Sequence, residues 1–311
     1  MKKKVLIVGS ANMDLSMNMY RIPEAGETLL DDGGVAYLPG GKGANAAIAF
    51  ARLGADAVFV AKLGADLHGQ RLYNYYKDSG INTSGIKVDK EEPTGLAVVM
   101  KEASGENRII VYPGANAKLT PENIGEALSA SVDGLYLGFE IPFETVLISA
   151  NLAKERGVPI FIDAAPADKS QPLERLPMVE IFSPNETETL EYTGIRPESA
   201  ETCLRAAIAL SKRVKAKYIV IKMGARGAFI YDGMKYFIIP ALSAGKVVDT
   251  TSAGDTFTAA MTLKYLETGD IRIAVRYGCA AAAITVTRRG SSGSVPTEDE
   301  VKRLMLKYEM G

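Results

Sequence analysis

Short apolar segments alternate with longer amphipathic segments along most of the chain. The short segments are rich in Val, Ile and Phe and poor in charge: Val5–Val8, Ala57–Lys62, Gly134–Leu137, Pro159–Ile162, Val179–Phe182 and Tyr218–Lys222. Strands buried on both faces have this composition, because helices cover both sides of a parallel sheet. The segments predicted to be helical are Ala44–Leu53, Gly69–Ser79, Pro142–Arg156, Glu186–Tyr192, Ala200–Val214, Gly254–Glu267, Ile271–Thr287 and Thr297–Met310. This order predicts an α/β fold, a Rossmann-like, doubly wound, mostly parallel sheet flanked by helices.

Two stretches near the start depart from this order. Leu15–Pro39 and Thr94–Tyr112 lack helical periodicity and alternate as strands do. They can pair as a small sheet whose exposed edges need cover. A lid over an active-site cleft, or pairing with another subunit, would meet that need; an antiparallel extension without a role is the alternative. Because no repeat or linker interrupts the chain, we expect one domain over residues 1–311, with lid inserts at about 15–39 and 94–112.

Composition removes several classes of function. The chain has 36 basic and 37 acidic residues, which argues against a general nucleic-acid surface. Cys203 and Cys279 form no CxxC pattern, so a disulfide framework or zinc site is not expected. The single histidine, His68, rules out histidine clusters and is expected to be a solvated loop residue. The apolar run Val5–Gly9 is too short for a signal peptide, and no membrane span is evident, so we expect a cytoplasmic protein.

Val248–Phe257 carries the strongest local signal for phosphate chemistry. A turn of small residues leads into a helix predicted to begin near Gly254, and backbone N–H groups at a helix start attract anions. Asp255 lies in that first turn, where its carboxylate can accept a proton from an attacking hydroxyl. A favourable first-turn acid without a catalytic role is the alternative.

Leu38–Ala47 contains Gly-Gly-Lys-Gly before an alanine-rich helix. The segment fails the P-loop template, since Ala36 stands where the first glycine is required and Lys42 is followed by glycine. What remains is a flexible backbone with close-approach glycines, together with Lys42 and Asn45, which suit hydrogen bonding to a polyol. A purely structural glycine-rich turn is the alternative.

Ser10–Asp14 follows the first predicted strand. Ligands of open α/β sheets bind beyond the carboxyl ends of strands. Asn12 and Asp14 offer paired donors and acceptors for vicinal hydroxyls, although Asn and Asp are also common in turns.

Ser183–Glu188 lies where another predicted strand ends and a helix begins. Asn185 and Glu188 are spaced for a capping box, which would be a structural role. The functional alternative is a carboxylate and an amide near Mg²⁺ and its waters, because Mg²⁺ keeps several waters when it binds proteins.

Together and in this order, these segments resemble the PfkB, or ribokinase, family of carbohydrate kinases. The resemblance runs the length of the chain, and Gly-Gly-Lys-Gly-Ala-Asn and Ala-Gly-Asp are highly specific as a pair. Other matching segments are Pro23–Thr28, Asp163–Ala167, Lys222–Gly227 and Ala280–Pro296. The resemblance implies ATP-dependent phosphorylation of D-ribose at its 5-hydroxyl, giving ribose 5-phosphate and ADP, under a lid that excludes water.

The resemblance also implies roles for matching positions. Asp255 would be the catalytic base, and the amides of Ser252, Ala253 and Gly254 would form an anion hole. Together with Asp255, the sugar would be bound by Asn12, Asp14, Gly40, Gly41, Lys42, Asn45 and Glu140. ATP would contact Asn185, Lys222, Gly224, Ala225, Arg226, Gly227, Gly254 and Cys279. Glu188 would organise Mg²⁺, and a monovalent-cation site, usually filled by K⁺, would be formed by Asp249, Thr251, Thr285, Arg288, Gly290 and Ser294. Members of this kind usually form homodimers through the lid strands.

Three positions depart from the family pattern. Ser252 stands where Gly or Ala is common, Asp163 where Asn is common, and Cys279 where a polar residue often touches the adenine. These departures concern the nucleotide side and leave the expected reaction unchanged.

Other functions stay open at this point. The same family includes kinases for nucleosides, 2-keto-3-deoxygluconate and fructose 6-phosphate, while the Asn12 and Asp14 pair together with Gly40–Asn45 favours a free pentose. A non-catalytic sugar-sensing protein is a different class. Such a protein would not need Asp255, so the presence of this residue favours an enzyme. A NAD-dependent dehydrogenase is excluded, since Gly9–Asn12 lacks GxGxxG.

Overall fold

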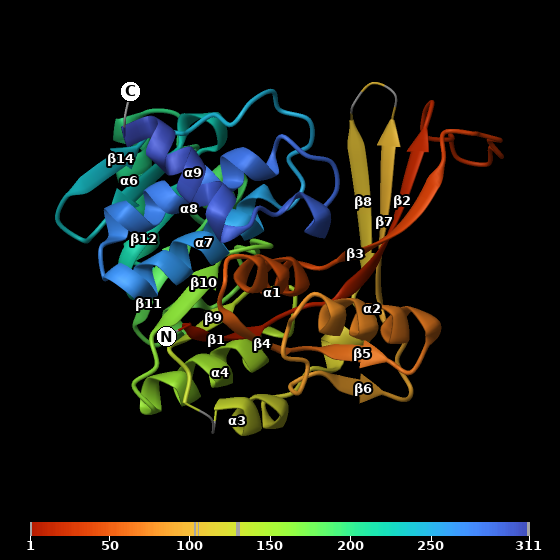
Figure 1. Cartoon of the computed structure of the whole chain (residues 1–311), viewed down its shortest axis with the longest axis horizontal. Helices are drawn as coiled ribbons and strands as arrows, with labels where there is room; N and C mark the ends of the chain where they lie inside the picture. Colours follow the sequence, from red (N-terminus) through yellow and green to blue (C-terminus); the bar gives the residue numbers. More distant parts are fainter. Residues whose placement is uncertain (1, 103, 105, 129–130, 310–311) are drawn as a thin grey trace.

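The computed structural model describes residues 2–102, 104, 106–128 and 131–309. The strands of its main sheet are β1 (Lys4–Val8), β4 (Asp56–Val60), β9 (Gly134–Leu137), β10 (Ile160–Asp163), β11 (Val179–Ser183), β12 (Ala216–Lys222), β13 (Ala228–Tyr231) and β14 (Tyr236–Ile239). They form an eight-stranded sheet in the order β14-β13-β12-β11-β10-β9-β1-β4 (Figure 1). The strands from β12 to β4 are parallel, and β13 and β14 extend one edge antiparallel. The predicted mostly parallel sheet is confirmed.

Helices cover both faces of this sheet. One face is packed by α3 (Glu122–Leu128), α4 (Phe143–Glu155), α5 (Glu186–Thr193) and α6 (Ala200–Ser211). The other is packed by α1 (Lys42–Arg52), α2 (Leu67–Asp78), α7 (Ala253–Thr268), α8 (Ile271–Thr285) and α9 (Glu298–Glu309). Alternate residues of one strand serve the two layers: Leu6 and Val8 pack in the first core, and Val5 and Ile7 in the second. Two buried faces explain the continuous apolar runs of the sequence.

A smaller sheet, called the lid below, is formed by β2 (Asn12–Met19), β3 (Val35–Gly40), β7 (Gly95–Glu102) and β8 (Asn107–Tyr112). Its order is β3-β2-β7-β8, with β2 and β7 parallel and the outer pairs antiparallel. Figure 1 shows its strands extending beyond the main sheet, with one end close to α2. The predicted small sheet is therefore present. Because β2 begins at Asn12, a few residues after β1 ends, the lid grows directly out of the carboxyl edge of the main sheet.

Several local predictions differ from the structure. The run Ala57–Lys62 divides into β4 and the short β5 (Lys62–Gly64), which pairs with β6 (Lys87–Asp89) in a two-stranded sheet. The expectation for His68 was wrong: it belongs to α2, and its ring stacks on Tyr37 with 5.6 Å between centroids. Tyr37 belongs to the lid, so this stack joins α2 to the lid. Met310, the predicted end of the last helix, lies outside the described residues.

Among the described residues, no helix combines the length and apolar character needed to cross a bilayer.

Candidate active site

Polar side chains gather where β1, β9, β10, β11 and β12 end. The main sheet there supplies Glu140 after β9, Asp163 on β10, Asn185 after β11 and Lys222 on β12. The amino-terminal part of α7 lies against the same edge, since Thr258 donates to Asp163. Open α/β sheets bind ligands at this edge, and most of the residues predicted from the sequence meet here.

The glycine-rich segment is explained by close packing of α1 onto the β1–β2 turn. A Cβ on Gly43 would lie 2.6 Å from the Cα of Gly9, and one on Gly41, where φ is +89°, would lie 2.9 Å from the amide nitrogen of Asn12. A Cβ on Gly40 would lie 2.0 Å from Oδ1 of Asp14. Side chains at these positions would displace the start of α1 or the carboxylate of Asp14.

Asp255 lies at the centre of the cluster, with 5% of its surface exposed. Its Oδ2 accepts a hydrogen bond from Nδ2 of Asn45 at 2.9 Å, and its Oδ1 lies 3.6 Å from Nζ of Lys42. Burial raises the pKa of Asp255, and the nearby ammonium of Lys42 opposes that rise. In turn, the carboxylate of Asp255 raises the pKa of Lys42. A buried carboxylate with a raised pKa is suited to general-base catalysis.

The first turn of α7 exposes backbone amides next to this carboxylate. Ser252 has a φ of 61°, the one positive value among the described residues other than glycine. The amide of Ala253 donates to the carbonyl of Thr250 at 3.2 Å, whereas no partner within the described residues is found for the amides of Ser252 and Gly254. The left-handed residue before the helix turns successive N–H groups toward one side, which makes an anion-binding concavity.

The residues expected to bind the sugar lie on β2 and its neighbours. The Oδ1 atom of Asn12 accepts a hydrogen bond from Nδ2 of Asn116 at 2.7 Å. Asp14 has a pKa raised to about 7, first by burial and then by the charges of Glu140 and Asp255. Its Oδ1 atom has no hydrogen-bond partner among the described residues. A buried acceptor without a donor is costly, and a sugar hydroxyl would supply the missing donor.

Glu140 joins the turn after β1 to the start of α1. Its Oε2 atom accepts from Oγ of Ser10 at 2.5 Å and from the amide of Lys42 at 3.0 Å. Sequence reasoning had not identified Ser10 or Asn116, which orient predicted site residues. Asn116 follows a Pro-Gly-Ala turn after β8, and its link to β2 becomes visible only when the lid is paired.

Most of the residues expected to bind the nucleotide lie at or after the ends of β11 and β12. Asn185 and Glu188 form the predicted capping box of α5, with both oxygens of Glu188 accepting from Asn185. Gly224–Arg226 forms a short 3₁₀ turn, and Arg226 is paired with Glu186 at the surface. Cys279 is buried in α8, where burial raises the pKa of its thiol to about 12.

The fit of the expected Mg²⁺ can be tested on Glu188. Burial raises the pKa of this carboxyl, and Lys222 opposes the rise. No cluster of three or more His, Cys, Asp or Glu side chains spaced for a metal occurs in the described part of the chain. These residues fit an ion that takes most of its ligands from water and phosphate oxygens, as Mg²⁺ commonly does.

The residues expected to hold K⁺ are partly assembled around Asp249. Its Oδ1 atom accepts from the amide and hydroxyl of Thr251, at 2.9 and 2.6 Å, and its Oδ2 accepts from the amide of Gly290 at 3.1 Å. The side chains of Arg288, Thr285 and Ser294 bond elsewhere, to Glu300, Ala281 and Ser291 respectively.

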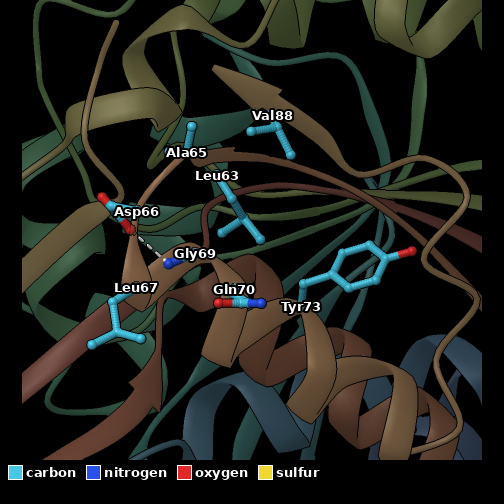
Figure 2. Close-up of a pocket in the computed structure, with 9 residues that line it drawn as sticks. Leu63, Ala65, Asp66, Leu67, Gly69, Gln70, Tyr73 and Val88 are labelled. Carbon is cyan, nitrogen blue, oxygen red and sulfur yellow. Dashed lines mark hydrogen bonds between the residues drawn. The ribbon is translucent and has the colours of Figure 1, made fainter. Parts of the chain in front are cut away.

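A separate pocket lies outside this cluster. It has a volume of about 590 Å³ and lies between α2 and the β5–β6 sheet, lined by Leu63, Gly64, Ala65, Asp66, Leu67, Gly69, Gln70, Tyr73 and Val88 (Figure 2). The carboxylate of Asp66 is occupied with the amide of Gly69 at 2.7 Å. None of the predicted site residues lines this pocket.

Comparison with known proteins agrees with the geometry. Residues 2–298 match the pfkB family carbohydrate kinase. The chain is 35% identical to the ribokinase of Haemophilus influenzae, over 96% of this chain and 97% of that protein. It is also 35% identical to the bifunctional ribokinase/ribose-5-phosphate isomerase A of Fructilactobacillus sanfranciscensis, of which it spans 57%. The structure of Arabidopsis thaliana ribokinase complexed with ribose and ATP superposes with a TM-score of 0.88 at 32% identity, covering 98% of this chain and 99% of that one. The chain therefore belongs to the PfkB family of carbohydrate kinases, enzymes that transfer a phosphoryl group to a sugar hydroxyl.

Proposed function

We propose that this protein phosphorylates D-ribose at its 5-hydroxyl with ATP, giving ribose 5-phosphate and ADP. The observation that carries the proposal is the position of Asp255, a buried carboxylate in the first turn of α7, held by Asn45 and beside Lys42. A base and a set of anion-binding amides are thus adjacent, as phosphoryl transfer to a hydroxyl requires. The chain aligns with nearly the whole length of the ribokinases of Haemophilus influenzae and Arabidopsis thaliana, which supports ribose as the sugar.

In the proposed step, the ribose 5-oxygen forms a bond to the γ-phosphorus of ATP. The bond between that phosphorus and the β–γ bridging oxygen breaks, and ADP leaves with the bond's electron pair. The proton of the hydroxyl passes to Asp255. The amides of Ser252 and Gly254 stabilise charge on the transferred group, and the remaining contribution is positioning.

The sugar would be oriented by the groups on the β2 side. Asn12, fixed by Asn116, and Asp14, with its unpartnered oxygen, would bind vicinal hydroxyls. Gly40 and Gly41 would allow the sugar to approach the backbone, and Glu140 would hold the start of α1 in place. We assign ATP to the opposite side, against Asn185, Lys222, Gly224–Gly227 and Cys279.

Two cations would assist. Glu188 and Asn185 would hold the waters of Mg²⁺, which neutralises charge on the ATP phosphates when bound. Carbonyls of the two loops joined by Asp249 would hold K⁺ beside the first turn of α7, where it would strengthen the field of the anion hole.

We also propose that the whole chain acts as one kinase domain and that two copies associate through the lid. The outer strand β8 exposes Ile109, Ile110, Val111 and Tyr112, and β3 exposes Val35 and Tyr37. An exposed apolar sheet with open edges favours association, and a second copy offers the same surface.

The substrate assignment is tested by measuring ADP release from Mg·ATP with purified protein. The panel contains D-ribose, 2-deoxyribose, fructose, 2-keto-3-deoxygluconate, fructose 6-phosphate, adenosine and inosine, each with and without K⁺. The highest kcat/KM is expected for D-ribose, with an increase on adding K⁺. A higher kcat/KM for a nucleoside or phosphosugar would contradict the ribose assignment and leave the kinase mechanism in place.

A further inference from the structure

A buried ion pair lies directly beneath the first turn of α7. Nζ of Lys222 is 2.9 Å from Oδ1 of Asp163, and these residues are 9% and 2% exposed. The hydroxyl of Thr258, on α7, donates to Oδ2 of Asp163 at 2.8 Å and lies 3.4 Å from Nζ of Lys222. Three elements, β10, β12 and α7, therefore meet in one polar network.

The network is joined to the proposed anion hole. The hydroxyl of Thr258 also lies 3.1 Å from the carbonyl of Gly254, one helical turn earlier. A Cβ on Gly254 would have Nζ of Lys222 as its nearest atom, at 3.9 Å. An ammonium group has three N–H donors, and within the described residues Lys222 uses two, toward Asp163 and Thr258. The third donor has no partner among the described residues, and Nζ lies within reach of the α7 turn.

A contribution to fold stability does not by itself explain the buried ion pair of Lys222 and Asp163. A buried ion pair adds little net stability, because desolvation of two charges offsets their attraction. The helix start also carries partial positive charge, which repels the ammonium of Lys222. The carboxylate of Asp163 compensates for both effects and keeps the cation beneath the turn. A negatively charged phosphoryl group would meet an ammonium that is already in position during its transfer, so the site would not need to reorganise.

We propose that Lys222 is a catalytic residue that donates a hydrogen bond to the transferring phosphoryl group, and that Asp163 and Thr258 are positioning residues that hold it there. This inference rests on the proposed function and identifies a source of positive charge for the same step. Lys222 keeps its proton throughout: the P–O bond to ribose forms, the P–O bond to ADP breaks, and the hydroxyl proton goes to Asp255.

The test compares Lys222→Met, Asp163→Asn, Thr258→Val and the double variant Asp163→Asn/Lys222→Met. The matched control is Lys217→Met, which breaks the ion pair with Glu180 near the amino end of the same strand. For each protein, kcat, KM for sugar and ATP, and the thermal midpoint are measured. Binding of AMP-PNP and of ADP is measured by calorimetry.

Lys222→Met is expected to lower kcat by about 10²–10³-fold, as for loss of one transition-state donor, with the KM for sugar unchanged within about two-fold. Asp163→Asn is expected to lower kcat by about 10-fold through misplacement, and Thr258→Val by less. AMP-PNP affinity should fall in Lys222→Met while ADP affinity stays close to wild type. Lys217→Met should keep the wild-type kcat.

The double variant separates catalysis from structure. The double variant leaves no buried charge without a partner, so its thermal midpoint should return toward that of the wild type. Its kcat should stay as low as that of Lys222→Met. Recovery of kcat in the double variant would overturn the inference and leave a structural ion pair. If the wild type prefers another sugar to ribose, the ribose assignment fails and the variants are compared on that sugar. If no sugar turns over, equal losses of AMP-PNP and ADP affinity in Lys222→Met would overturn the inference, and a selective loss of AMP-PNP would support it.

Discussion

The carboxyl edge of the main sheet and the lid are built on opposite principles. At the edge, Asp163 and Thr258 are almost fully buried, and their polar atoms are hydrogen-bonded to neighbours on three different elements. In the lid, Ile109 and Ile110 are 56% and 64% exposed, on a strand that is paired along one side. Polar groups at the edge are thus held in place by their neighbours, whereas β8 of the lid leaves apolar side chains in solvent.

The largest effect is expected from the edge. Asp255→Asn should lower kcat with ribose by about 10²–10⁴-fold, because the amide cannot accept the hydroxyl proton. Steady-state kinetics with Mg·ATP measures this change. The matched control is Asp133→Asn, which removes a partner of Lys3 and of the amide of Lys4 at the other end of the strands. If Asp255→Asn and the control both keep a kcat close to that of the wild type, Asp255 is not the catalytic base.

A smaller effect is expected where the edge meets the lid. Gly40→Ala places a methyl group against the carboxylate of Asp14, because a Cβ at this position would lie 2.0 Å from Oδ1 of that carboxylate. Displacement of the carboxylate should raise the KM for ribose by about 10–100-fold with a smaller change in kcat. Gly125→Ala, where a Cβ meets nothing within 4 Å, is the control. Equal KM values for the two variants would argue against Asp14 as a sugar ligand.

The pH dependence of ribose binding sharpens the same assignment. Asp14 is protonated in the free protein below about pH 7, where its pKa stands. A hydroxyl donates more strongly to the carboxylate than to the acid, so affinity should rise by about 10-fold between mildly acidic and mildly basic pH. Calorimetric titration at several pH values measures this. Asp14→Asn should bind ribose more weakly, and its affinity should no longer rise with pH. An unchanged rise in that variant would show that another group causes the pH dependence.

Asp14 also makes the stability of the fold depend on pH. Its folded pKa of about 7 exceeds the ordinary value of 3.8, so between these values the folded protein binds more protons than the unfolded chain. The free energy of unfolding should therefore fall as pH rises through that window, by on the order of 1–3 kcal/mol from this group. Urea unfolding at the two ends of the window should show a smaller decrease for Asp14→Asn than for the wild type.

The smallest catalytic effect is expected from the lid surface. Ile110→Lys places a charge on the exposed apolar strand and should convert the proposed dimer to a monomer, with kcat reduced by only a few-fold. Light scattering after gel filtration measures the mass. Ile208→Lys, at an exposed isoleucine of α6, is the control and should stay dimeric. A dimer that persists in Ile110→Lys would place the interface elsewhere.

Much of the architecture could be predicted from pattern, because strands such as β1 and β10 are buried on both faces and read as continuous apolar runs. The edge hairpin of β13 and β14 was missed, although Asp232-Gly233 is a turn signal between its strands. The three-residue strands β5 and β6 are too short for any periodicity to identify.

For the site, the motifs located Asp255, Lys42 and Asn45 because each lies next to a glycine-rich or small-residue turn. The partnership of Asp163 with Lys222 could not be predicted in the same way. The two residues lie 59 positions apart, on strands that are separated by β11 in the sheet. Only the three-dimensional order of strands places their side chains together. The same holds for Asn116, which is 104 positions from Asn12.

The position of the phosphate in the product tests the proposed reaction most directly. Wild-type protein, Mg·ATP and D-ribose are incubated, and the product is analysed by ³¹P and ¹³C NMR beside Asp255→Asn. We expect phosphorus coupled to carbon 5 for the wild type and a rate of product formation reduced by about 100-fold or more for the variant. Phosphorus on carbon 1, or equal rates for the two proteins, would contradict the proposed reaction.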